Sequence, residues 1–218
     1  MKQRNLFDPL PSRRASVEKE WSPHEGEDWA YANSFTRIVG LDEAGRGPLA
    51  GPVVAAAVAL DATRPIAGLT DSKLLSESQR DRLAALIRAQ ARAVGVGIVD
   101  AGAIDAMNIL RASLEAMRRA LVESGANADV LLVDGTHTVP VAIAQRTLVK
   151  GELRSQSIAA ASIIAKVTRD ALMRDLDRQY PAYGFAIHKG YPTVAHRALI
   201  RALGPSPVHR LTFRGVIV

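Results

Sequence analysis

Residues 39–48 read Val-Gly-Leu-Asp-Glu-Ala-Gly-Arg-Gly-Pro, and this stretch decides both the expected fold and the expected chemistry. The adjacent carboxylates Asp42 and Glu43 end a short apolar segment, and the glycine turn Gly45-Arg46-Gly47 follows within two residues. Neighbouring residues of a strand point to opposite faces, so both acids can serve one site only where the strand ends. A solvated acidic turn would look the same. An acid pair beside a turn that allows close backbone approach nevertheless favours a divalent metal and phosphodiester chemistry.

Composition narrows the chemistry further. Of 218 residues, 48% are hydrophobic, which is enough for a core and excludes global disorder. The chain has no cysteine, so disulfides, thiol nucleophiles and cysteine-based zinc sites are excluded, and its five histidines show no paired spacing. No apolar stretch has bilayer length, and the polar start at residues 1–4 is not a signal peptide. We therefore expect a cytoplasmic protein without membrane association that uses carboxylates and hard metal ions.

The positive charge is concentrated near the C-terminus. Residues 1–35 and residues 36–144 each carry one more acid than base. Residues 145–214 hold twelve lysines and arginines against four acids, and they account for the net charge of +6. A basic surface without any partner would give the same distribution. A basic third attached to an acidic core is nevertheless typical of a protein that holds a polyanion over a metal site.

Hydrophobic periodicity predicts three regions. Residues 1–35 are rich in proline, serine and mixed charge, so we expect an irregular, flexible N-terminal extension, although both tryptophans (Trp21 and Trp29) lie in it. Residues 36–179 are expected to form an α/β domain with a mixed sheet, and residues 180–218 a C-terminal substrate-binding loop and helical segment. The apolar patterns place strands at 38–42, 53–60, 94–99 and 130–133, the first two as a hairpin, and helices at 76–92, 109–121, 157–178 and 194–202.

Two further acids occupy positions that fit a shared site. Residues 130–133 form a short apolar strand that places Asp134 at its carboxyl end, where ligands gather in α/β sheets. Glu152 precedes the long helix expected from residue 157, although a favourable interaction with the helix dipole would explain it equally well. Asp170 lies inside that helix, so we expect it to form an intrahelical or structural ion pair. Acids that end strands are common in turns, but two of them on separate strands favour one site.

Seven short motifs follow one another along the chain. They are residues 40–52 (Gly-Leu-Asp-Glu-Ala-Gly-Arg-Gly-Pro-Leu-Ala-Gly-Pro), 69–73, 133–135, 158–170, 183–185, 188–193 and 209–213. Their ordered set resembles the signature of bacterial ribonuclease HII over about residues 36–216, without large gaps. The resemblance implies a ribonuclease H-like mixed five-stranded sheet flanked by helices, with a small C-terminal helical segment.

The same resemblance implies an endonuclease that hydrolyses the RNA strand of RNA–DNA hybrids. It would also incise 5′ of a single ribonucleotide in duplex DNA, leaving a 3′-hydroxyl and a 5′-phosphate. By position, Asp42, Glu43 and Asp134 would be catalytic carboxylates that bind metal. The fourth acid of the family is usually the Asp of a Lys-Gly-Asp triplet, whereas this chain has Glu152, which is one methylene longer, so metal affinity or preference is expected to differ. The four acids would hold two Mg²⁺ or Mn²⁺ ions, which activate a water and neutralise the leaving 3′ oxygen.

Recognition of RNA requires contact with the 2′-hydroxyl. Backbone groups of the turn Gly45, Arg46 and Gly47 are suited to this, because glycine permits close approach. Tyr191 resembles the family tyrosine that packs on the sugar after the ribonucleotide, although by itself it could be an ordinary loop aromatic. Phosphate contacts are expected from Ser72, Lys73, Lys150, His188 and Lys189.

The N-terminal segment carries a candidate partner motif. Residues 3–7, Gln-Arg-Asn-Leu-Phe, are similar to the Gln-x-x-Leu-Phe peptides that bind bacterial sliding clamps, so Gln3, Leu6 and Phe7 are candidate contacts. We expect a monomer whose other partners are RNA–DNA hybrid and ribonucleotide-containing duplex DNA.

Two other functions fit the same residues. Another ribonuclease H-fold nuclease that acts on DNA structures, such as a junction resolvase, would need clustered acids and a basic face. It would not need Tyr191 or the glycine turn as sugar sensors. A non-catalytic hybrid-binding protein would follow if Glu152 disables the metal site.

Overall fold

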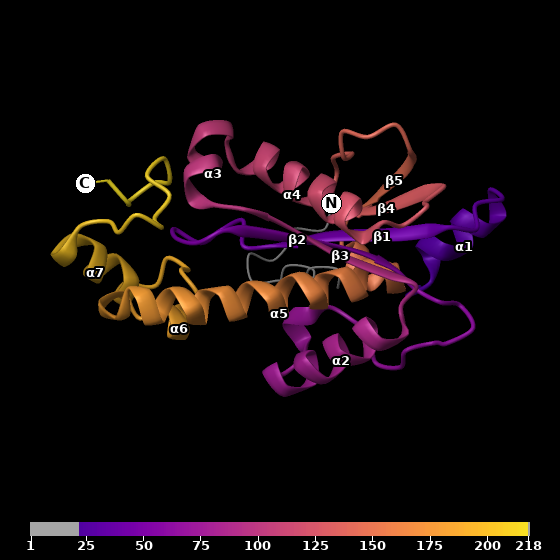
Figure 1. Cartoon of the computed structure of the whole chain (residues 1–218), viewed down its shortest axis with the longest axis horizontal. Coiled ribbons are helices and arrows are strands. Elements are labelled where there is room, and N and C mark those ends of the chain that lie inside the picture. The colour runs from indigo at the N-terminus through magenta and orange to yellow at the C-terminus, as the bar shows by residue number, and fades with distance from the viewer. Residues whose placement is uncertain (1–21, 218) are drawn as a thin grey trace, which may run out of the picture.

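A five-stranded mixed sheet forms the centre of the molecule (Figure 1). The structure is a computed structural model that describes residues 22–217. The strands are β1 (Ile38–Ala44), β2 (Val53–Ala59), β3 (Ala93–Val99), β4 (Val130–Asp134) and β5 (Ala144–Leu148). Their order is β3-β2-β1-β4-β5, with antiparallel pairing within β1–β2–β3 and parallel pairing of β1 with β4 and of β4 with β5. This confirms the expected mixed sheet and its first hairpin.

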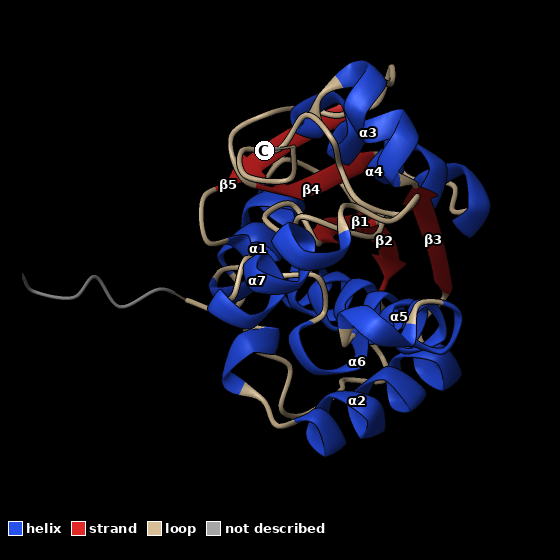
Figure 2. Ribbon diagram, turned by 90° about the vertical axis from the view of Figure 1, so that its left-hand side faces the viewer, coloured by secondary structure: helices blue, strands red, loops and turns tan. Residues whose placement is uncertain are grey.

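Helices cover both faces of the sheet (Figures 1 and 2). They are α1 (Glu25–Ala32), α2 (Glu77–Gln90), α3 (Ala101–Met107), α4 (Ile109–Ser124), α5 (Gln156–Gln179), α6 (Phe185–His188) and α7 (Val194–Leu203), with 3-10 turns at Ser72–Leu74, Gly151–Leu153 and Pro181–Tyr183. Helices α3 and α4 lie on one face, and α2 and α5 lie on the other. The core therefore has two layers, one on each side of the sheet. Within residues 22–217, the helices are all too short or too polar to cross a membrane.

Glycines let the helices approach the central strands closely. A Cβ atom at Gly40 of β1 would lie 2.2 Å from the backbone of Ser157 in α5. One at Gly97 of β3 would lie 1.9 Å from the carbonyl oxygen of Ala116 in α4. Strands β1 and β2 are buried along most of their length, which explains their nearly continuous apolar sequences. This close packing fixes the positions at which β1 and β4 end.

Most segments predicted from periodicity are present at the expected places. The helices expected at 76–92, 157–178 and 194–202 are α2, α5 and α7. Asp170 forms the expected intrahelical ion pair, 2.7 Å from the ammonium nitrogen of Lys166. Strand β5 and helix α3 were not predicted, because β5 is mostly polar and half-exposed and α3 has only seven residues.

The N-terminal region differs from the expectation. Helix α1 belongs to the folded domain, because Trp29 and Phe35 pack against a buried cluster that includes Ile38. An ion pair also ties the helix down, since the Arg154 Nε atom donates to Glu25 at 2.9 Å. The prediction of an irregular extension up to residue 35 is therefore wrong for α1. Trp21 and the rest of residues 1–21 lie outside the described residues.

The C-terminal segment packs against α5 and returns to the start of β2. Ala50, Met173, Tyr183 and Phe185 form one buried cluster. Ala50 also forms a β-bridge with His209. The C-terminal segment therefore supports the connection between β1 and β2, which contains the glycine turn.

Candidate active site

Two acids meet at one edge of the sheet because β1 and β4 are parallel neighbours. Leu41 pairs with Val133 in their register, so the next residues, Asp42 and Asp134, lie side by side where this parallel pairing stops, although β1 itself continues to Ala44. The carboxyl ends of parallel strands are a favoured place for ligands in α/β sheets. The sheet topology therefore accounts for the first half of the site.

The other two acids are brought to the same edge by short segments. Glu43 follows Asp42 directly, and its side chain is only 10% exposed. Glu152 lies in the 3-10 turn after β5, and its side chain is also 10% exposed. The backbone N–H of Gly151 donates to the carboxylate of Asp134 at 2.8 Å, which ties this turn to the end of β4. The acids that the sequence singled out thus gather at one edge.

Crowding makes these carboxylates costly to ionise. Burial raises the pKa of Asp42 well above its usual range, and the nearby charges of Glu43 and Asp134 raise it further. Burial is also the main cause that raises the pKa of Glu43, Asp134 and Glu152. Groups shifted by both burial and like charge are often found at functional sites. A bound cation would relieve both contributions.

Two surface cations already stand beside the acids. A guanidinium nitrogen of Arg46 lies 3.4 Å from Glu43, and the ammonium of Lys73 lies 3.9 Å from Glu152. Burial acts against the charged form of Lys73, but Asp71 and the site acids together raise its pKa. Because these side chains are long and largely exposed, they can move away when a ligand arrives.

The donor set fits a hard divalent cation. Carboxylate oxygens are the ligands that Mg²⁺ and Mn²⁺ prefer, and the raised pKa values mark four acids whose mutual repulsion a cation would remove. Within residues 22–217, no three acidic or histidine side chains already close around a common point. An ion would therefore have to draw the side chains together and compete with Arg46 and Lys73.

A buried arginine that the sequence reading missed holds the glycine turn from behind. Arg210 is 0% exposed and donates to the carbonyl oxygens of Gly45 at 2.7 Å, Arg46 at 3.0 Å and Gly51 at 2.8 Å. Burial lowers its pKa to about 9, and the nearby charge of Arg169 contributes. These bonds fix the direction of the carbonyl groups, so the backbone of the turn has one conformation.

A second buried arginine completes this support. Arg169 of α5 is 0% exposed and donates to the carbonyl oxygens of Pro52 at 3.0 Å and Ala50 at 3.2 Å. Its guanidinium carbon lies 5.8 Å from the ring centre of Tyr191. A single sequence gives no signal for such a role, because a buried arginine and a surface arginine look identical in it.

The two glycines of the turn differ in their surroundings. Gly45 has φ +98°, and a Cβ there would lie 2.1 Å from Nε of Arg169, so packing alone requires glycine. Gly47 is exposed, and a Cβ there would meet only the ring edge of Tyr191 at 3.9 Å. Tyr191 is itself 41% exposed. Gly47 and Tyr191 thus form an accessible pair beside the acids.

Two of the five expected phosphate contacts are wrong. The hydroxyl of Ser72 is buried and lies 3.0 Å from that of Ser162. Both ring nitrogens of His188 are occupied: Nδ1 accepts from the N–H of Gly190 at 3.1 Å, so Nε2 carries the proton and donates to the carbonyl of Tyr183 at 2.7 Å. Burial cannot be read from local sequence, which explains both errors. Lys73 and Lys150 are exposed and Lys189 is half-buried.

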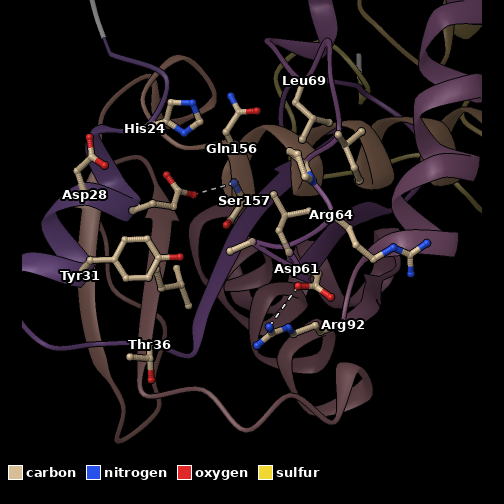
Figure 3. Close-up of a pocket in the computed structure, with 16 residues that line it drawn as sticks. His24, Asp28, Tyr31, Thr36, Asp61, Arg64, Leu69, Arg92, Gln156 and Ser157 are labelled. Carbon is tan, nitrogen blue, oxygen red and sulfur yellow. Dashed lines mark hydrogen bonds and ion pairs between the residues drawn. The ribbon is translucent and has the colours of Figure 1, made fainter.

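The acid edge is open rather than enclosed. A small hollow of about 110 Å³ borders Glu43, Arg46 and Asp134. A larger cavity of about 400 Å³ lies at the other end of β1, between Tyr31 and Leu69, and none of the four acids lines it (Figure 3). Enclosed pockets bury most of a small ligand. The shallow acid edge is better suited to a long polymer that lies across it.

Comparisons with known proteins found a matching family and similar structures. The family model described as "Ribonuclease HII" matches residues 39–216. A ribonuclease HII of Geobacter sulfurreducens is 56% identical over 190 residues, which cover 87% of this chain and 88% of that protein. A ribonuclease HII of Archaeoglobus fulgidus, solved in a complex with PCNA, has a TM-score of 0.70 at 26% identity over 82% of this chain and 96% of its own. The fold also matches Bst ribonuclease HIII, solved with Mn²⁺, with a TM-score of 0.65 at 24% identity over 83% of this chain and 68% of its own.

Proposed function

This chain belongs to the ribonuclease HII family, and from that premise we propose that it cuts RNA strands in RNA–DNA hybrids and incises 5′ of single ribonucleotides in duplex DNA. That it is a metal-dependent ribonuclease H follows from the family itself, which confirms the enzyme interpretation over a non-catalytic binding protein. The finer proposal concerns the position of the cut and its products, a 3′-hydroxyl and a 5′-phosphate.

The observation that carries this proposal is the continuity of β1 with the glycine turn. Strand β1 carries Asp42 and Glu43, ends at Ala44 and leads directly into Gly45–Gly47, so the acids and Gly47 lie on one short stretch of backbone, with the ring of Tyr191 beside Gly47. A sugar held at Gly47 would place its neighbouring phosphate at the acids. Because only RNA has a 2′-hydroxyl, contact with the backbone of the turn would select the ribonucleotide.

We propose that Asp42, Glu43, Asp134 and Glu152 hold two Mg²⁺ or Mn²⁺ ions. When bound, the ions supply an activated water and neutralise the charge on the leaving 3′ oxygen. The chain itself orients the substrate: the turn holds the sugar, and Tyr191 packs on the next sugar. Lys73, Lys150 and Lys189 hold the phosphates on either side, which positions the duplex without reading its sequence.

A cleavage assay tests this proposal directly. The substrates are an end-labelled DNA duplex with one ribonucleotide, the same duplex without it, and a long hybrid, each with Mg²⁺ or Mn²⁺ over a range of concentrations. We expect a single cut on the 5′ side of the ribonucleotide, with a product that a polymerase can extend. Equal cutting of the all-DNA duplex would overturn the proposal. Asp28→Asn, which changes an exposed acid at the remote cavity, is the matched control and should retain activity.

We further propose that residues 3–7 bind a sliding clamp. Gln3, Leu6 and Phe7 lie outside the described residues, so the proposal rests on their sequence and on the Archaeoglobus relative, which was solved with PCNA. A tethered enzyme would meet ribonucleotides where DNA is replicated or repaired. Because that DNA is genomic, we propose that the enzyme acts in the cytoplasm. We also propose that it acts as a monomer. Deleting residues 1–8 should abolish retention on an immobilised clamp without changing cleavage of a free duplex.

A further inference from the structure

Three histidines of the C-terminal segment form one cluster beside Tyr191. His196 of α7 is 0% exposed and His209 is 2% exposed, and their Nε2 atoms lie 3.0 Å apart. The ring of His188 stacks on that of His196 with 4.2 Å between ring centres. The chemistry of the acid edge does not use these rings.

Backbone groups determine which nitrogen of each ring carries the proton. The N–H of Ser206 donates to Nδ1 of His209 at 2.9 Å, so the proton of this ring is on Nε2. That Nε2–H must donate to Nε2 of His196, which is therefore an acceptor. The proton of His196 is then on Nδ1, where it donates to the carbonyl oxygen of Tyr191 at 2.9 Å. A single directed chain of hydrogen bonds leads from Ser206 to Tyr191.

The other side of the Tyr191 segment is held in the same way. His188 uses both of its ring nitrogens for backbone groups, and its ring packs on His196. The backbone N–H of Tyr191 donates to the carbonyl of His188 at 2.9 Å. The carbonyl and the N–H of Tyr191 are thus both hydrogen-bonded, and the ring of His188 packs on His196. Tyr191 itself stays 41% exposed.

We propose that His196 and His209 are positioning residues that hold Tyr191 against Gly47 and so set the preference for a ribonucleotide. This inference rests on the role proposed above for Tyr191. The chain of bonds requires both rings to be neutral. An extra proton on His196 would place two Nε2–H donors opposite each other, and an extra proton on His209 would place an Nδ1–H opposite the N–H of Ser206. If the carbonyl of Tyr191 were displaced, the Tyr191 ring would move away from Gly47. A Cβ atom added at Gly47 would lie 3.9 Å from this ring.

The surroundings of the pair favour the neutral rings. Burial lowers the pKa of His209 to about 4 and also lowers that of His196, with smaller contributions from neighbouring histidines and Arg197. The hydrogen bonds of the two histidines are therefore intact at neutral pH and are lost as pH falls toward the lowered pKa values. His188, Tyr183 and Tyr191 contact the pair directly, and Arg197 follows His196 in α7. Arg169 lies against Tyr191, and Arg210 follows His209 in the chain. Asp105 accepts from the N–H groups of residues 211 and 212.

The protonation pattern can be tested on the wild-type protein. Nitrogen-15 NMR of the imidazole rings, assigned with His196→Asn and His209→Gln, distinguishes the two neutral forms. We expect His196 with its proton on Nδ1 and His209 with its proton on Nε2, and both rings to titrate below the usual range of histidine. The opposite form of either ring, or titration between pH 6 and 7, would overturn the proposal.

The effect on recognition needs variants. The readout is the ratio of affinities for a duplex with one ribonucleotide and for the all-DNA duplex, measured by anisotropy without metal at pH 7.5. We expect His196→Leu and Tyr191→Ala each to lower this ratio about tenfold, because an aromatic stacking contact to the nucleic acid is lost. His196→Asn keeps an N–H near the position of Nδ1 and should stay within about threefold of the wild type. His24→Asn, an exposed histidine at the other end of the sheet, is the control.

The outcomes separate the two proposals. If Tyr191→Ala leaves the ratio unchanged, the proposed role of Tyr191 fails. If Tyr191→Ala lowers the ratio and a folded His196→Leu does not, the role of the histidines fails alone. Should His196→Leu not fold, His209→Leu takes its place, since it removes both the acceptor for Ser206 and the donor to His196.

Discussion

The acid edge and the support of the glycine turn lie side by side but are stabilised in opposite ways. At the acid edge, burial and then the neighbouring like charges raise the pKa of Asp42, and exposed side chains such as Lys73 lie beside the acids. Behind the turn, Arg210 and the histidine pair are buried with their polar atoms bonded to backbone or to each other. Catalysis benefits from carboxylates whose repulsion a bound cation would relieve. Recognition of the sugar requires instead that the backbone of the glycine turn does not move.

The largest expected effect comes from the acid edge. Asp134→Asn keeps an acceptor for the Gly151 N–H but removes one negative charge, so we expect cleavage to fall by at least about 10³-fold. Stability should be unchanged or higher, because the repulsion with Glu43 is lost. Single-turnover cleavage and thermal unfolding check the two parts. Cleavage within tenfold of the wild type would remove Asp134 from the metal site.

Removal of the buried arginine behind the glycine turn should lower the stability of the protein, in contrast to Asp134→Asn. Arg210→Met leaves the carbonyl oxygens of Gly45 and Gly51 buried without a donor, and we expect a loss of about 2–4 kcal/mol of unfolding free energy. Urea denaturation measures this loss, with Arg201→Met on the exposed side of α7 as the control. Discrimination against all-DNA duplex should fall in the same variant. A variant that keeps wild-type stability would show that these bonds contribute little.

The two regions should also respond to pH with opposite signs. Because the folded-state pKa of Asp42 is raised, the folded protein takes up protons before the unfolded chain does, and acidification stabilises this region. The pKa of His209 is lowered to about 4, so the unfolded chain is protonated first and acidification destabilises its region. In metal-free buffer between pH 7.5 and 5, Asp42→Asn should therefore lose more stability than the wild type, and His209→Gln should lose less, the latter by about 1 kcal/mol. Unfolding curves at both pH values measure the difference, and shifts of the same sign in both variants would contradict it.

The contrast also explains what could be predicted from sequence. Strands β1 to β4 and the long helices were predicted because periodicity is a local signal, and the four acids were singled out because they lie next to predicted strands or helices. Arg169, Arg210 and the bonding of the histidines were missed, because their roles depend on burial that arises only when distant segments pack. Ser72 and His188 were assigned to phosphate for the same reason, and α1 was overlooked because its apolar contacts come from the sheet.

The smallest expected effect concerns the fourth acid. Glu152→Asp restores the residue usual in the family but shortens the side chain by roughly 1.5 Å, one carbon–carbon bond. The turn that carries Glu152 is held to Asp134 through Gly151, so its backbone cannot advance to compensate. We therefore expect the Mg²⁺ or Mn²⁺ concentration for half-maximal cleavage to rise a few-fold, with the saturated rate within about threefold, since each tenfold corresponds to about 1.4 kcal/mol. Metal titrations of the variant, with Glu77→Asp on α2 as the matched control, decide this point. An unchanged metal requirement would mean that Glu152 does not contact the ions, and that the rigid turn beside the acid edge belongs with the recognition region instead.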